Sequence, residues 1–175
     1  MAEDFVCSRC GRKHEGLITD QAYKLPDDVW SISESERAEK ARFDSDLCQF
    51  GERFFIPGLL LVPFSDQPDA FGWGVWVEVE LSVFKRYLEL YEADGSHEPP
   101  HRGVLANDIL GYPSSLGAEV AINFMAAAER PLVSVLGQNG GHLAEEQQRG
   151  MSDARYHQIL DLIASREGVG AGLVC

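Results

Sequence analysis

The sequence predicts an α+β fold, a mostly antiparallel sheet of about five strands with three or four helices packed against one face. Apolar residues alternate with glycine and polar residues over 71–80, which is the period of a strand with one buried face. Apolar residues recur at helical spacing over 83–91 and again over 156–163. Each of these helices can therefore place one apolar face on the sheet.

Composition favours a single domain. The chain has 175 residues, of which 45% are hydrophobic and 25% charged, the proportions of a globular protein with one core. We expect one domain over 1–175, with a knuckle and helix region over 1–50 and a flexible tail over 168–175. The longest apolar run, 54–64, is too short to span a membrane, and acidic residues stand where a signal peptide needs positive charge. We therefore expect a cytoplasmic location and no membrane contact.

The first helix is expected over 33–43. Ser33 and Glu36 have the spacing of a capping box, in which the serine side chain accepts a hydrogen bond from the N–H of the glutamate. The helix ends before 45–48, and this return of the chain brings Cys48 back toward the N-terminus.

Two long strands are expected next. The segment 53–64 predicts a strand with a kink at Pro57–Gly58, which favours a position near an edge or a bulge. A turn over 65–69 joins it to the alternating strand 71–80. We therefore expect an antiparallel hairpin.

The remaining elements are shorter. Ser82 begins a second helix, and Ser152 begins the last one. Between these helices lie three strand candidates separated by turns, over 104–107, 118–125 and 132–136.

Cys7 and Cys10, followed by Gly11 and His14, have the spacing of half of a tetrahedral zinc site. Two thiolates at this spacing can hold one Zn²⁺ from a single tight turn. The glycine lets the backbone fold back so that its N–H groups point at the sulfurs. Thioredoxin-like redox chemistry would need a long strand before this pair, so the spacing favours a metal.

A structural zinc ion needs four ligands, and the turn supplies two. Cys48 is the best third ligand, because the helix before it can return the chain to the N-terminus. His14 is the nearest candidate for the fourth, although it can instead donate to a thiolate from outside the ligand set. The alternative is that Cys7 and Cys10 are free thiols. Three further histidines stay open as ligands: His97, His101 and His142.

The charge balance excludes nucleic-acid binding. Acidic residues outnumber basic residues 28 to 15, which gives a net charge of −13. Such a charge serves solubility, and it also suits an acidic face that meets a basic protein partner. Trp76 shares a strand face with Glu78 and Glu80, so it is either an exposed anchor for a partner or is covered by a helix or loop.

Several sequence segments resemble a known bacterial family, the one called domain of unknown function 2199. These segments occur in order over residues 5–151, and the family brings no assigned activity. The resemblance therefore supports the fold and the metal site and leaves the function open. The segments are Cys7–His14, Ser45–Cys48, Gly74–Val77 with Phe84 and Tyr87, Gly111–Pro113, Arg130–Pro131, and His142–Ala144 with Glu146, Gln147 and Gly150.

Two functions remain from these observations. The first is a protein-interaction module with a structural zinc ion and an acidic surface, for example a bacterial immunity protein that neutralises a basic toxin. The second is a zinc-dependent enzyme such as a hydrolase, with a water in an open coordination position. The chain has neither of the common hydrolytic zinc patterns, HExxH or HxE with PCxxC, so the first function is favoured.

Overall fold

The computed structural model describes residues 5–6, 13–14, 20–137, 140–166 and 173–174. Within these residues, the helices are α1 Asp27–Trp30, α2 Glu34–Lys40, α3 Leu81–Glu89, α4 Gly141–Arg149 and α5 Asp153–Arg166. The strands are β1 Phe5–Val6, β2 Lys13–His14, β3 Asp20–Tyr23, β4 Ala41–Phe43, β5 Cys48–Phe50, β6 Arg53–Pro63, β7 Ala70–Val79, β8 His101–Leu105, β9 Glu119–Asn123, β10 Leu132–Val135 and β11 Leu173–Val174.

The main sheet closes into a five-stranded barrel. Nine strands follow the order β11-β3-β7-β8-β9-β10-β6-β5-β4, and β6 also pairs with β7, so that β7, β8, β9, β10 and β6 form a ring. Most pairs are antiparallel, as expected, while β3–β7 and β10–β6 are parallel. The expected sheet of about five strands has nine within the described residues, and five of them close into the barrel because β6 pairs along both of its edges.

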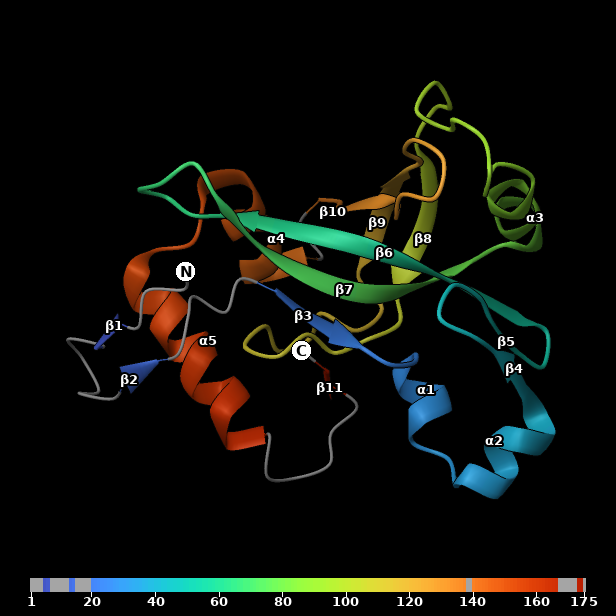
Figure 1. Cartoon of the computed structure of the whole chain (residues 1–175), viewed down its shortest axis with the longest axis horizontal. Helices are drawn as coiled ribbons and strands as arrows, with labels where there is room; N and C mark the ends of the chain where they lie inside the picture. The colour runs from blue at the N-terminus through green and yellow to red at the C-terminus, as the bar shows by residue number, and fades with distance from the viewer. Residues whose placement is uncertain (1–4, 7–12, 15–19, 138–139, 167–172, 175) are drawn as a thin grey trace.

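The β6–β7 hairpin is confirmed along its whole length (Figure 1). Its register pairs Ile56 with Val77 and Leu60 with Trp73. The expected edge position of Pro57–Gly58 is wrong, because β6 lies inside the sheet. On the side away from β7, β5 pairs with β6 no further than Phe55, and β10 pairs with it at Leu59. Pro57 lacks an N–H, and it lies in the gap between these two partners.

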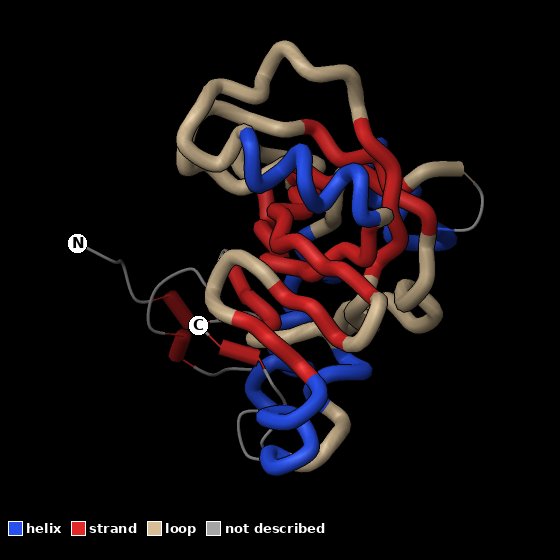
Figure 2. The backbone as a smooth tube through the Cα atoms, turned by 90° about the vertical axis from the view of Figure 1, so that its right-hand side faces the viewer, coloured by secondary structure: helices blue, strands red, loops and turns tan. Residues whose placement is uncertain are grey.

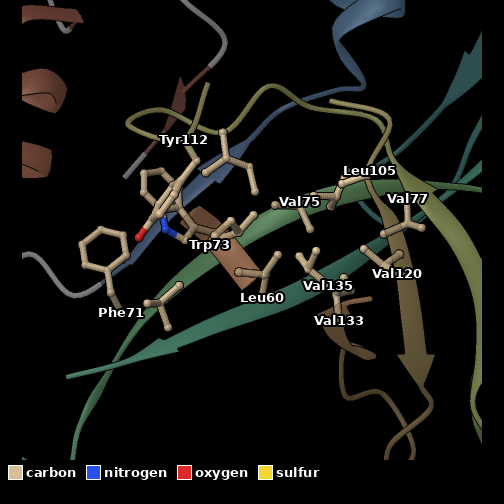
Figure 3. Packing of buried hydrophobic residues seen from close by; sticks show 14 of the residues in the cluster. Leu60, Phe71, Trp73, Val75, Val77, Leu105, Tyr112, Val120, Val133 and Val135 are labelled. Atoms are coloured by element: carbon tan, nitrogen blue, oxygen red, sulfur yellow. The ribbon is translucent and has the colours of Figure 1, made fainter. Parts of the chain in front are cut away.

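Apolar side chains from the strands fill the barrel. Figure 3 shows Val75, Val77, Leu105, Val120 and Val133 pointing toward one another from several strands. All five side chains are buried. This packing explains why residues of odd number on β7 are apolar while their neighbours are glycine, tryptophan or glutamate.

Helices pack on two sides of this sheet, and the prediction that they share one face is wrong. In α5, Tyr156 and Ile159 belong to the main core, and α4 packs against β6 and β10. In α1, Val29 belongs to a second apolar cluster on the other side of β7, together with Trp76. Figure 2 shows the helices distributed around the strands rather than gathered in one layer.

Two of the three predicted helix starts are confirmed, whereas the start at Ser82 is wrong, because α3 begins at Leu81 with Glu80 as its N-cap. Ser33 and Glu36 form the capping box at the start of α2, and Ser152 precedes α5. The predicted end near Phe43 is wrong, because α2 ends at Lys40 and the next three residues form β4. Of the tail predicted over 168–175, the described pair Leu173–Val174 forms β11 against β3.

No helix in the described part of the chain is both long and apolar enough to cross a bilayer.

Candidate functional site

The predicted zinc ligands are only partly described. Cys7 and Cys10 lie outside the described residues, and His14 is in β2, where the backbone alone is described. Cys48 is a free, fully buried thiol in β5. Figure 1 places β2 at the left of the view and β5 at the right.

Cys48 lies among apolar side chains. Its cluster includes Phe55, Trp76 and Ala106. Burial raises the pKa of the Cys48 thiol to about 12, so that it stays protonated at neutral pH. Among the described residues, no three or more His, Cys, Asp or Glu side chains come together to hold a metal ion.

The other candidate histidines lie on separate elements. Exposed His97 is 3.7 Å from Asp94 Oδ2, and His101 in β8 is 3.3 Å from Glu98 Oε2 and stacks near Phe124. His142 in α4 is largely exposed.

Trp76 is buried, with 3% of its surface exposed, so the expectation of an exposed partner-binding residue is wrong. The chain from β3 into α1 covers it, since Leu25 and Val29 belong to the same apolar cluster. Its indole Nε1–H donates to the backbone oxygen of Tyr23 at 3.1 Å. The sequence left open whether a helix or loop covers Trp76, and the structure shows that it is covered.

The acidic face of β7 opens into a groove of about 500 Å³, which we call the carboxylate groove. The groove lies next to the short stretch over which β7 and β8 pair. In this stretch Val77 pairs with Leu105, and Glu78 pairs with Val104. A cavity of this size is within the range of ligand-binding sites. Its charged lining residues are Glu78, Glu80, Arg102 and Glu119.

The carboxylates of this groove differ in their partners. Glu78 accepts two hydrogen bonds of 2.8 Å from the guanidinium of Arg53, which also contacts Asp28. Glu80 and Glu119 are exposed and form no ion pair with any described residue, and the same is true of Arg102. Within the described part of the chain, the groove therefore offers a ligand two carboxylates and one cation that form no ion pair.

A second groove, of about 310 Å³, lies at the gap where β6 changes partner, and we call it the Pro57 groove. Three of the segments that carry the family resemblance meet there, through Ser45, Gly74–Trp76 and Arg130. Its lining residues are Ala22, Tyr23, Lys24, Ser45, Pro57, Gly58, Gly74, Val75, Trp76 and Arg130.

Two further resemblance segments, 111–113 and 142–150, contribute to a packed polar cluster. The Tyr112 hydroxyl donates to Glu146 Oε2, and Arg155 Nε donates to Glu146 Oε1 at 3.1 Å. The Arg155 guanidinium also lies over the Tyr112 ring and donates to the backbone oxygen of Gly111. Burial, together with the bond to Glu146, raises the pKa of Tyr112 far above its ordinary value. These contacts join α4, α5 and the loop before Pro113.

Gln147 joins two strands of the barrel. Its amide nitrogen donates to Leu61 O in β6 and Val133 O in β10, and its amide oxygen accepts from Val135 N at 2.8 Å. The parallel pairing of β6 with β10 covers only Leu59 and Leu132, and the Gln147 amide adds hydrogen bonds that connect the two strands beyond it. This role is structural, and Gln147 lines neither the carboxylate groove nor the Pro57 groove.

Sequence reasoning named Glu78, Glu80 and Trp76, and it named Pro57, Ser45 and Arg130 without assigning them to a site. It missed Arg102, Glu119 and Lys24. Arg102 and Glu119 stand on short strands whose order in the sheet no local pattern reveals. Lys24 and Arg130 come together only because β3 and the β9–β10 loop border the same groove.

Comparison with known proteins adds one finding. A model of a bacterial family, described as "Uncharacterized protein conserved in bacteria (DUF2199)", matches residues 6–151. No curated protein and no solved structure matches the chain significantly.

Proposed function

The chain belongs to the uncharacterized bacterial family DUF2199, and we propose that it is a protein-interaction module that binds a basic partner through its carboxylate groove. The family assigns no activity. The proposal therefore depends on the surface of this chain, and a bacterial immunity protein that occupies the basic surface of a toxin is its most concrete form.

One observation carries the proposal. The groove exposes Glu80 and Glu119 without partners, in a chain whose net charge is −13. Carboxylates without partners attract Lys and Arg side chains, and the net charge raises the rate at which a basic protein arrives. Arg102 stands in the same groove and repels a uniformly basic ligand. The partner that suits this lining best presents cations to Glu80 and Glu119 and a carboxylate or an apolar side chain to Arg102.

The test is the binding of a defined basic peptide, such as a fluorescein-labelled chain of alternating lysine and glycine with one glutamate at its centre to face Arg102, followed by anisotropy. We expect the double variant Glu80→Gln/Glu119→Gln to bind about two- to thirty-fold more weakly, because each exposed charge pair contributes about 0.2–1 kcal/mol. The control is Glu34→Gln/Glu39→Gln, which removes the same charge from α2. Equal weakening in both variants would show binding to net charge alone and would contradict the proposal.

We further propose that Cys7 and Cys10 hold a structural zinc ion, with His14 and Cys48 as the candidate ligands that complete it. The spacing of the two thiols supports the metal. The apolar surroundings and raised pKa of Cys48 favour His14 over Cys48, because zinc binds the thiolate form.

Zinc content measured on tag-free protein tests this ligand set. We expect about one zinc per chain in the wild type and in Cys48→Ser, and loss of zinc in Cys10→Ser. Loss in both variants would make Cys48 a ligand. Cys175→Ser is the matched control at the other end of the chain, and a wild type without zinc would reject the metal site.

The alternative function, a zinc-dependent hydrolase, needs a ligand set with one position open to water. This alternative predicts that Cys7, Cys10 and one further residue bind the zinc ion and that a water molecule occupies its fourth coordination position. Zinc with four protein ligands, measured by X-ray absorption, would exclude this alternative.

A further inference from the structure

The Pro57 groove has an apolar floor and cationic sides. Pro57, Gly58 and Trp76 form buried parts of its lining. Lys24 and Arg130 are exposed and come from different segments, the end of β3 and the loop between β9 and β10. No carboxylate lines this groove, although acidic residues are almost twice as frequent as basic ones in the chain.

The polar groups on the floor are already used. Trp76 donates its backbone N–H to Asn107 Oδ1 at 2.8 Å and its indole N–H to Tyr23 O at 3.1 Å. The Ser45 hydroxyl donates to Asp46 Oδ2 at 2.7 Å. A ligand therefore finds apolar contact on the floor, and its polar contacts must come from the two cations.

The two cations keep free donors. Arg130 Nη2 donates to Ser45 O at 3.1 Å and lies 3.5 Å from Asp46 Oδ1, and its other nitrogens form no contact with the described residues. These two contacts fix the guanidinium beside the groove. The Lys24 ammonium lies 5.9 Å from the centre of the Trp30 ring and forms no ion pair within the described chain.

We propose that the Pro57 groove binds a small organic anion, with its charged group held by Lys24 and Arg130 and its apolar part on Pro57 and Trp76. The volume of about 310 Å³ is that of a site for a small molecule. A guanidinium fixed by the protein and a mobile ammonium both bind carboxylate and phosphate groups. The anion is therefore a carboxylate or a phosphate monoester attached to a compact apolar group.

Three probes of similar size test the proposal: benzoate, phenyl phosphate and the neutral benzyl alcohol. Binding is measured by the shift of the Trp76 indole N–H resonance during titration of the full chain. We expect benzoate or phenyl phosphate to shift this resonance saturably, and benzyl alcohol to bind at least about ten-fold more weakly. Binding of one anion and not the other identifies the charged group. No shift with either anion at about 10 mM, or equal binding of the alcohol, overturns the proposal.

Matched variants separate the groove from general charge effects. Lys24→Gln/Arg130→Gln is expected to weaken anion binding about ten-fold or more, while Lys85→Gln/Arg149→Gln, with the same change in charge on α3 and α4, leaves it unchanged. Equal weakening in both pairs overturns the proposal. Lys24→Gln alone removes no described hydrogen bond, and its only described contact is with the Trp30 ring, so an unchanged thermal unfolding curve for this variant assigns weaker binding to the lost charge. Arg130→Lys keeps the charge and is expected to retain most of the binding.

Discussion

Asn107 accepts a hydrogen bond from the backbone N–H of Trp76, with 2.8 Å between Oδ1 and the nitrogen. Asn107 is fully buried, and its amide nitrogen donates to Leu25 O and to Asp27 Oδ1, both at 2.9 Å. One side chain therefore joins β7 to the segment that covers Trp76. This contact fixes the buried position that the sequence left undecided.

The first prediction concerns this asparagine. Asn107→Ala leaves the Trp76 N–H and the Leu25 carbonyl without partners in a buried place, and each such loss costs about 1–3 kcal/mol. We expect the free energy of unfolding in urea to fall by at least about 2 kcal/mol. A fall below about 0.5 kcal/mol would mean that water replaces the amide. The control is Asn123→Ala, at a half-buried position of β9 where the side chain forms no hydrogen bond with any described residue.

The second prediction concerns the polar cluster of α4 and α5. Tyr112→Phe removes the hydroxyl that donates to Glu146, and a hydrogen bond to a charged group contributes about 1.5–3 kcal/mol. We expect a loss of stability of that size in thermal or urea unfolding. Tyr91→Phe, at an exposed tyrosine of α3's end, is expected to change stability by less than about 1 kcal/mol. Similar losses in both variants would contradict a special role for Tyr112.

The third prediction concerns the contact between β6 and β10. A Cβ atom on Gly58 would lie 2.3 Å from Val133 Cγ2, so Gly58→Ala must displace the Val133 side chain or the strand that carries it. Overpacking of this kind costs about 1–3 kcal/mol. Removing the Val133 methyl groups makes room for the new Cβ atom. We therefore expect the double variant Gly58→Ala/Val133→Ala to lose less unfolding free energy than the sum of the losses in the two single variants, as a double-mutant cycle measures. Strict additivity would contradict the close approach.

The fourth prediction concerns pH. The pKa of the Cys48 thiol is raised to about 12 in the folded chain, against about 8.5 when it is unfolded. The favourable contribution of the protonated thiol is complete below the unfolded pKa and is lost as the pH rises toward 12. Between pH 8.5 and 10.5, wild type should lose more stability than Cys48→Ala, by at most about 1.4 kcal/mol per pH unit. Parallel loss in both proteins would contradict a buried thiol.

The local parts of the fold were predictable, and the parts that depend on distant pairing were not. Ser33 and Glu36 lie in one turn, and the alternating residues of β7 report their own two faces, so that short stretches of sequence predicted the capping box and the hairpin correctly. Barrel closure depends on the pairing of Leu59 with Leu132, residues far apart in the chain. No pattern within either segment signals that pairing.

The candidate sites were predictable only where one strand carried them. Glu78 and Glu80 were recognised because alternation places them on one face of the strand predicted over 71–80, although β7 ends at Val79 and Glu80 is the N-cap of α3. The same rule could not decide whether Trp76 is covered, because its cover comes from β3 and α1. Lys24 and Arg130 belong to one groove through tertiary structure alone.

The short contact between β6 and β10 has a consequence for the order of folding. The β6–β7 hairpin joins neighbouring segments and can form early, whereas the barrel closes only when β10 and Gln147 of α4 reach β6 from late in the chain. During synthesis, β6 therefore emerges with an unpaired edge and must wait for its last partner. A nascent chain truncated before β10 should expose that edge to proteases and to other chains, and this interval is where chaperone binding would matter most.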